Sequence, residues 1–462
     1  MPLILGTNSI KDTGYNVDNS LRFDDGSSDY LSRTPSSTGN TKKFTISFWC
    51  KRSALGTYQD IFHVYSGSGQ RSQILFLSND TLQIELESAN LNKLVTSRVF
   101  RDPSAWMHIV VVYDSDNGTS GNRVILYVNG VRETSFSTEN YPSSGSTSGI
   151  NTTTQHEISS YDGAGYFYDG YLSEFVLLDG IVADPTSFGE FDEDTGIWKP
   201  IDVSGLTFGN NGFYLDFENS GSLGADVSGN GNNFTVNNLT AIDQTTDTPT
   251  NNFATGNPLD YSGTAPTLGN GNLSITSAEL SDKPFRTTIA VSQGKWYMEY
   301  KCEKSGSDND NHIGLWSAEN SLTSNYVGYQ LYSWGIFTGN GNKRNNQSYD
   351  SYGSAIAQND IVMIALDKDN GKIWWGKNGT WFASGNPATG SNEAFSNINT
   401  VVGSNGFVSF CFLPQQKFSL NFGSPPFTIS SGNSDANGYG NFEYSVPSGY
   451  YSLNTKNLAE YG

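Results

Sequence analysis

Short segments in which apolar and polar residues alternate with a period of two occur along the whole chain. Such alternation is typical of half-buried β-strands, because successive side chains point to opposite faces of a sheet. No long stretch has apolar residues at the three-to-four spacing of an amphipathic helix, so we expect little helix. The clearest predicted strands are 44–50, 72–78, 82–87, 106–113, 123–128 and 171–178, followed by 295–301, 312–316, 361–366, 372–376 and 407–412.

A unit of strand, turn, strand and turn occurs twice. In each half of the chain two predicted strands are followed by an Asn-Gly pair, Asn129-Gly130 in the first half and Asn378-Gly379 in the second. Asn-Gly accepts the positive φ angles of a type I′ turn, which matches the twist of paired strands. The repeat therefore predicts an antiparallel meander in each half and an all-β fold of two sandwiches.

The chain has 462 residues, which is too long for one β-sandwich and suits two. The middle of the chain is rich in Asn, Gly and Thr but contains the aromatic piece 212–217, so we expect an ordered connector that buries these aromatics. The predicted divisions are 1–200 for the first sandwich, 201–262 for the connector, 263–430 for the second sandwich and 431–462 for an extended C-terminal segment.

The formal net charge of −20 restricts the kinds of molecule that the protein is expected to bind. Phosphate backbones and anionic membrane surfaces repel such a protein, so we expect no nucleic acid partner. The longest apolar runs are too short to span a bilayer, and we expect no membrane insertion. Cations and basic partner surfaces are favoured.

The three cysteines, Cys50, Cys302 and Cys411, each lie in a strand-like run. Their odd number argues against a disulfide framework and predicts buried free thiols. Residues 1–6 carry no basic residue and only a short apolar run, which does not indicate a signal peptide. Both features suit folding in a reducing cytoplasm.

Several segments of the first half resemble a laminin G-like (concanavalin A-like lectin/glucanase) sandwich. They are Ser20–Asp24 with Asp29–Leu31, Trp106–Val110, Leu126–Val131 and Tyr168–Phe175. The resemblance covers about the first 185 residues. It implies a jelly-roll sandwich, and some members of the family hold calcium at a loop rim.

The second half resembles a SPRY domain, which is also a jelly-roll sandwich. That family's Gly-x-x-Tyr-Trp-Glu strand has Tyr297-Met298 in place of Tyr-Trp here. SPRY domains bind protein segments through loops at one end of the sandwich, so the resemblance implies a binding role. The matching segments are Gly294–Glu299, Ile313–Leu315, Ser333–Gly335, Asp360–Asp367, Lys377–Gly379, and Asn421–Gly423 with Pro426–Phe427.

The pairing of these domains, together with four further segments, resembles structural proteins of marine bacteriophages, which are commonly tail-fibre or capsid-decoration proteins. The resemblance implies synthesis in the host cytoplasm, a place on the virion surface, assembly as a homo-oligomer and contact with other virion proteins or a host-cell glycan. A purely structural spacer of the particle is an alternative. The four segments are 189–192, 198–200, 226–239 and 448–458.

The alternative of a glycan hydrolase depends on Glu190-Phe191-Asp192-Glu193-Asp194. Laminarinase-like members of the superfamily carry alternating carboxylates on one strand, which places acid, helper and nucleophile on one face. Here the run ends in Asp rather than Glu and lies beyond the closing strand, where a solvated turn is expected. The four histidines are scattered, and His108 is interpreted as a packing residue. We therefore expect no enzyme and no catalytic residue.

Calcium is the one cofactor that the sequence leaves open, and we expect no organic cofactor. Asp114-x-Asp116-x-Gly118 looks like the start of a calcium loop but lacks the later ligands, including the Glu at position twelve. A hairpin turn explains the same residues and is the favoured interpretation. Asp114 and Asp116 remain the predicted ligands if a metal is bound.

Two loops, 137–157 and 338–354, are predicted as the adaptable surfaces. Tyrosines among Ser, Gly and Asn are typical of recognition loops, because they offer rigid aromatic area at low entropy cost. We expect Tyr349 and Tyr352 to be exposed and Trp334, just before the loop, to lie in the core. The predicted ligand-binding residues are Tyr349, Tyr352, Arg344 and Tyr329.

Overall fold

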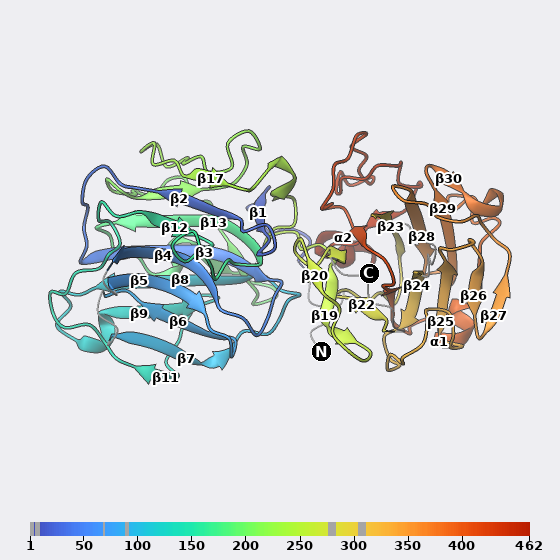
Figure 1. Ribbon diagram of the computed structural model, residues 1–462, viewed down its shortest axis with the longest axis horizontal. Helices are drawn as coiled ribbons and strands as arrows, with labels where there is room; N and C mark the ends of the chain where they lie inside the picture. The colour runs from blue at the N-terminus through green and yellow to red at the C-terminus, as the bar shows by residue number, and fades with distance from the viewer. Residues whose placement is uncertain (1–3, 5–9, 68–69, 88–91, 276–282, 304–310) are drawn as a thin grey trace. The chain divides into compact units, whose positions relative to one another are not determined.

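The computed structural model describes residues 4, 10–67, 70–87, 92–275, 283–303 and 311–462. The chain forms two compact units, one from 13 to 250 and the other from the chain up to residue 12 together with 251–462 (Figure 1). We call them the first and the second unit. Strands account for 40% of the residues and helices for 6%, which confirms the predicted all-β class of two antiparallel jelly-roll sandwiches.

The first unit consists of two facing antiparallel sheets. One contains β10 (Val131–Arg132), β9 (Val124–Val128), β8 (Met107–Asp114), β3 (Lys43–Arg52), β13 (Gly170–Asp179), β1 (Ser20–Phe23) and β18 (Gln244–Thr245) in spatial order, with β16 (Phe213–Leu215) also paired to β13. The other contains β11 (Phe136–Glu139), β7 (Lys93–Val99), β6 (Thr81–Glu85), β5 (Gln70–Phe76), β4 (Gln59–Gly67), β12 (His156–Ile158), β2 (Tyr30–Arg33) and β17 (Thr235–Asn237).

Alternation along β3 directs one set of its side chains, Phe44, Ile46 and Phe48 among them, into the core between the sheets. The neighbouring strand β8 is buried on both faces. Ile109 belongs to the core between the two sheets. Val110 points to the opposite face of its sheet, where it packs in a second cluster with side chains such as Phe188 and Tyr214. This double burial explains why residues 109–112 read as one continuous apolar run.

The predicted connector, 201–262, is divided between the two units. Its aromatic piece forms β16, which pairs with β13, and β17 and β18 extend both sheets of the first unit. Phe213 and Phe217 reach the central core, so the need to bury aromatic side chains draws residues 201–250 into the first sandwich. Residues 251–262 belong to the second unit, where β19 (Gly256–Tyr261) pairs with another strand.

The second unit has the same two-sheet plan. One sheet has β19, β22 (Phe285–Thr287), β31 (Val408–Leu413), β24 (His312–Ser317), β25 (Ser333–Phe337), β26 (Lys343–Asn345) and β27 (Ser348–Asp350) in spatial order. The other has β20 (Leu268–Gly269), β21 (Ser274–Ile275), β32 (Phe418–Asn421), β23 (Lys295–Cys302), β28 (Ile361–Asp367), β29 (Lys372–Lys377) and β30 (Thr380–Trp381), with β33 (Tyr451–Ser452) parallel to β23.

Both Asn-Gly pairs form the predicted tight turns. Asn129 and Gly130 have φ of 48° and 75°, and Asn378 and Gly379 have φ of 49° and 80°. These positive values are those of a type I′ turn. The remaining elements are β14 (Gly189–Phe191) paired with β15 (Trp198–Pro200), α1 (Ile398–Val402), α2 (Thr455–Tyr461), η2 (Ser120–Asn122), η3 (Pro185–Ser187), η4 (Ala241–Asp243) and η5 (Phe382–Ser384).

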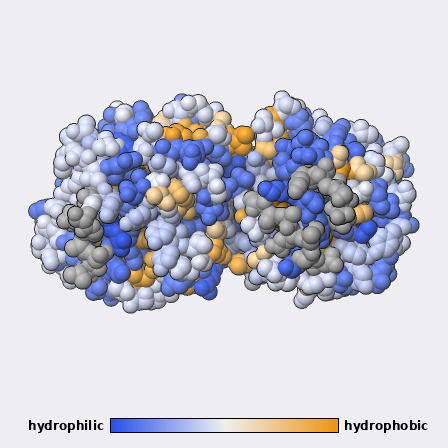
Figure 2. Space-filling view, viewed as in Figure 1, coloured by the Kyte–Doolittle hydropathy of each residue, from blue (hydrophilic) through white to orange (hydrophobic). Residues whose placement is uncertain are grey.

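The three cysteines are buried thiols and none of them forms a disulfide, as the sequence predicts. Hydrophilic residues dominate the face drawn in Figure 2, and hydrophobic residues lie there in small separate patches. Within the described residues, no helix has the length and apolar character needed to cross a membrane.

The C-terminal segment 431–462 is anchored to the second unit by the buried side chain of Glu299 in β23. The carboxylate accepts hydrogen bonds from the backbone N–H groups of Glu443 at 2.9 Å and Tyr444 at 2.7 Å. It also accepts bonds from the Asn421 amide and the Tyr297 hydroxyl. One buried carboxyl group thus fixes the loop between β32 and β33.

Glu299→Ala should lower the free energy of unfolding of the second unit by about 3–5 kcal/mol, because it leaves buried donors without an acceptor. Urea unfolding measures the loss, and hydrogen exchange over 431–447 shows whether the segment is released. The control is Glu303→Ala, whose carboxylate pairs with Lys301 at 3.4 Å near the surface and should cost less than about 1 kcal/mol. Equal losses in both variants would contradict the anchoring role.

A buried carboxyl interrupts the central strand β13 of the first unit. The ladder shifts register between Ser173 and Val176, and Glu174 has a φ of 51°. Its carboxyl accepts hydrogen bonds from the hydroxyls of Tyr214 at 2.8 Å and Tyr15 at 3.4 Å. Burial raises the pKa of Glu174 to about 8, so the side chain is largely protonated at neutral pH.

This raised pKa predicts a pH-dependent stability. The folded state binds the Glu174 proton more tightly than the unfolded chain, so its contribution falls as the pH rises from about 4.5 to 8. Glu174→Gln cannot ionise, and the stability of this variant relative to wild type should therefore increase between pH 5 and pH 8. Urea unfolding at four pH values across this window tests it. Parallel curves would show that Glu174 does not carry the dependence.

Candidate binding surfaces

In the second unit, the predicted loop 338–354 contains two short strands. β26 pairs with β25, and β27 pairs with β26, so the loop extends the sheet at its edge. The register places Arg344 opposite both Gly335 and Tyr349. A polar, Tyr-rich sequence thereby forms an ordered sheet edge rather than an irregular loop.

Aromatic rings surround the Arg344 guanidinium. It lies 4.3 Å from the ring centre of Phe337, 4.4 Å from that of Tyr349 and 5.0 Å from that of Tyr326. Tyr326 also contacts Tyr329 with ring centres 5.1 Å apart. We call these five residues the Arg344 patch. Stacking of this kind fixes the orientation of a long cationic side chain.

The Arg344 patch has a buried base and an exposed rim. His312 stacks on Tyr326 beneath it, and its Nε2 accepts a hydrogen bond from Arg344 at 3.4 Å. Burial, together with the charge of Arg344, lowers the pKa of His312 to about 3, so the ring stays neutral. Tyr349 is 48% exposed, and Leu331, whose carbonyl accepts from Asn345 of β26, is 49% exposed.

The structure brings three of the four predicted ligand-binding residues together, Tyr329, Arg344 and Tyr349. The fourth, Tyr352, was expected to be exposed, and this expectation is wrong. Tyr352 is 9% exposed and packs edge-on against Trp375 and Phe382. The chain turns inward after β27, which carries Tyr352 into the core. Trp334 is fully buried, as predicted.

The two tyrosines should therefore respond differently to truncation. Tyr352→Ala should lower the free energy of unfolding by about 3–5 kcal/mol, as other large aromatic core truncations do. Tyr349→Ala, on the exposed rim, should cost less than about 1 kcal/mol. Urea unfolding of the two variants side by side gives the comparison. A large loss for Tyr349→Ala would show that it supports the fold.

The predicted metal ligands lie beside basic side chains. The carboxylate of Asp114 pairs with Lys43 at 3.7 Å, and that of Asp116 pairs with Lys42 at 3.6 Å. The backbone between them forms a turn, with the N–H of Asn117 donating to the carbonyl of Asp114. The local geometry is that of an ion-paired hairpin connection.

The carboxylates weighed for catalysis are also engaged. Glu190 and Asp192 both pair with Lys199 of β15, at 3.4 and 3.3 Å. Asp192 also accepts hydrogen bonds from the N–H and hydroxyl of Thr195, which closes the turn between β14 and β15. His108 is buried and bonded at both ring nitrogens, to Ser47 and Trp198, in agreement with a packing role.

The first unit has a depression that the sequence did not single out. Its volume is about 440 Å³, and Tyr58 and Tyr166 stand in its wall, 45% and 47% exposed. Their ring centres are 5.3 Å apart. The other lining residues are Asp25, Gly56, Thr57, Ser78 and Phe167. The segments meet only in the folded chain, so no local pattern marks the site.

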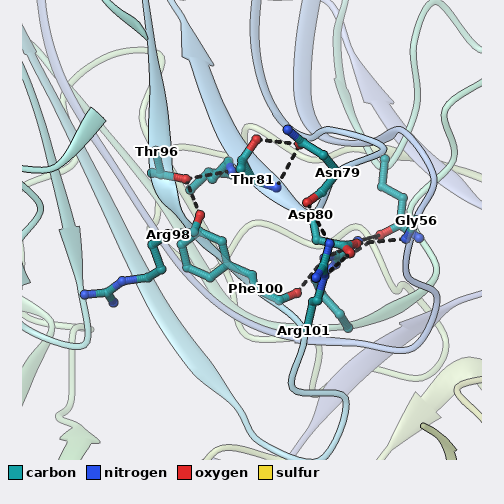
Figure 3. A network of polar contacts seen from close by, with 11 residues as sticks. Gly56, Asn79, Asp80, Thr81, Thr96, Arg98, Phe100 and Arg101 are labelled. Atoms are coloured by element: carbon teal, nitrogen blue, oxygen red, sulfur yellow. Dashed lines mark hydrogen bonds and ion pairs between the residues drawn. The ribbon is translucent and has the colours of Figure 1, made fainter. Parts of the chain in front are cut away.

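Gly56, one of the lining residues, is held by a buried polar network (Figure 3). One oxygen of Asp80 accepts from the backbone N–H of Gly56 at 2.8 Å, and the other accepts from Arg101 at 2.7 Å. Arg52 donates to Asp80 at 3.1 Å and to the carbonyl of Phe100 at 2.6 Å. The hydrogen bond from Gly56 to Asp80 therefore fixes the loop that carries Tyr58.

The chain matches two known families. Residues 25–183 match the Concanavalin A-like lectin/glucanases superfamily, and residues 295–425 match the SPRY domain. The ATP-dependent RNA helicase DDX1 of Xenopus laevis is 30% identical over 174 residues, which make up 37% of this chain and 21% of the helicase. The chain thus spans about a fifth of the length of that relative.

Two solved structures show distant similarity, each at 16% identity and over 36% of this chain. The SPRY domain of human HERC1 is covered to 96% with a TM-score of 0.29. The heptameric SAP-like pentraxin of Limulus polyphemus is covered to 78% with a TM-score of 0.26. The family matches agree in position with the two sandwiches, and the chain carries a concanavalin A-like lectin/glucanase domain followed by a SPRY domain.

Proposed function

We propose that this chain is a non-enzymatic binding protein on the surface of a bacteriophage particle, in a tail fibre or as a capsid decoration. Its second unit binds another virion protein through the Arg344 patch. The observation that carries the proposal is the stacked, partly exposed Arg344 among tyrosines at the edge of a SPRY sheet. The virion setting is supported by the segments that resemble marine bacteriophage structural proteins.

The chemistry of the Arg344 patch fits a protein partner. Arg and Tyr are enriched among the residues that dominate protein interfaces, because they combine a large contact area with hydrogen-bonding ends. Tyr349 and Leu331 add exposed apolar area beside the guanidinium. A partner segment that brings a carboxylate or an aromatic ring would meet a pre-oriented cation, at little cost in side-chain entropy.

The alternatives have weaker support. For a glycan hydrolase, the best carboxylate pair is already bound to Lys199 and to the turn at Thr195. For a purely structural spacer, exposed Tyr349 and Leu331 would serve no contact. A host-cell glycan remains a second ligand class, supported by the match of the first unit to a lectin superfamily and by its tyrosine-walled depression.

The double variant Arg344→Ala, Tyr349→Ala should weaken attachment to particles that lack the protein by about tenfold or more, since loss of such anchors costs about 1–4 kcal/mol. Binding of fluorescent full-length chain to purified particles measures the affinity, and immunogold labelling locates the protein. Tyr261→Ala, an exposed tyrosine of the same unit, should bind as wild type. The same proteins on a glycan array test the second ligand class.

Three results would contradict the proposal. Unchanged attachment of the double variant would exclude the Arg344 patch. Failure of the antibody to label particles would exclude the virion setting. Polysaccharide cleavage by wild type that is lost in Glu190→Gln, Asp192→Asn would replace the binding function with the hydrolase.

A further inference from the structure

Three carboxylates meet at one end of the first sandwich, from segments far apart in the sequence. Asp24 and Asp25 follow β1, and Asp169 precedes β13. The two strands are paired, with Phe23 opposite Gly170, so the ladder itself brings Asp24 and Asp169 together. One carboxylate oxygen from each of the three residues lies within 4.8 Å of the others.

One carboxylate oxygen of the buried member of this group has no hydrogen-bond partner. Asp169 is 3% exposed, and its Oδ1 is buried without a hydrogen bond. Asp29 lies beside the group, 2% exposed, and its Oδ2 accepts from the N–H of Asp24 at 3.0 Å. A buried carboxylate oxygen is costly to leave unpaired, so Oδ1 of Asp169 points to a missing donor or cation.

Within the described residues, the three carboxylates form no salt bridge with a basic side chain. The Arg52 guanidinium directs its hydrogen bonds to Gln59, Asp80 and the carbonyl of Phe100, although its charge favours the ionised form of Asp169. Burial, and next the charges of Asp25 and Asp24, raise the pKa of Asp169 well above its usual range.

We propose that Asp24, Asp25 and Asp169 bind a calcium ion at the junction of β1 and β13. Calcium takes six to eight oxygen ligands at about 2.3–2.6 Å, so two ligands on opposite sides of the ion are at most about 5 Å apart. Carboxylate oxygens within 4.8 Å of one another fit around such an ion. Water can complete the shell, because Asp25 is exposed to solvent.

The ion would connect two parts of the first unit that otherwise repel each other. It would hold the turn 24–29 against the end of the segment that precedes β13. Asp25 also lines the depression with Tyr58 and Tyr166, so the ion would stand in its wall. Any ligand of that depression would then bind in a calcium-dependent way.

The test uses the full-length chain freed of metal with EGTA. Titration calorimetry with calcium chloride should give saturable binding, and calcium should raise the melting temperature of the first unit. Asp25→Asn and Asp169→Asn should each weaken binding at least about tenfold, since affinity follows the number of charged ligands. In EGTA, Asp169→Asn should melt above wild type, because it removes the buried carboxylate.

The control is the double variant Asp114→Asn, Asp116→Asn, which should keep wild-type calcium affinity. Asp25→Asn keeps the test valid if Asp169→Asn fails to fold, since Asp25 is exposed. Three outcomes would overturn the proposal. They are the absence of saturable binding up to several millimolar calcium, wild-type affinity in Asp25→Asn, and loss of binding in the control, which would place the ion at the β8–β9 connection.

Discussion

The end of the first sandwich that carries the depression depends on the hydrogen bonds of the buried Arg52 guanidinium. Arg52 ends β3 in one sheet and donates to Gln59, which begins β4 in the other. Through Asp80 it also fixes the loop at Gly56. A buried charge is tolerated only when its hydrogen bonds are satisfied. The segments that carry Gln59, Asp80 and Phe100 must therefore all be in place around Arg52 when the two sheets pack together.

The second unit reaches the same end with the opposite charge. Glu299 accepts four hydrogen bonds and draws the segment after β32 onto its sheet. Both units thus use buried ionisable groups, the Arg52–Asp80 pair in the first and Glu299 in the second, to hold a loop in one conformation. Such segments bury too little apolar surface to be fixed by packing alone.

The sequence predicted what short-range patterns determine. Alternation located most of the long strands, and the Asn-Gly pairs located both type I′ turns, because each depends on neighbouring residues only. It failed where distant segments meet. Composition suggested that Tyr352 is exposed, but the inward turn after β27 buries it against Trp375. Nothing near Asp24 in the sequence indicates that Asp169 lies beside it.

The division of residues between the units has the same origin. Residues 201–250 read as a connector because they are polar, yet β16 pairs with β13 and its aromatic side chains complete the first core. In the second unit, the polar loop 338–354 became a sheet edge through the pairing of β26 and β27. In both cases strand pairing overrides local composition, with a distant strand in the first unit and with neighbouring strands in the second.

The path of the chain also imposes an order of events during synthesis. Ile4 pairs with Ile289, so the first sandwich is an insertion between the earliest described residue of the second unit and the remainder of that unit. The inserted sandwich is complete once residue 250 has left the ribosome, whereas its host still lacks every strand from β19 to β33 and both helices. At about 5–20 residues per second, the remaining 251–462 take roughly 10–40 s to appear. During this interval the lectin-like sandwich must fold alone, with its host unfinished.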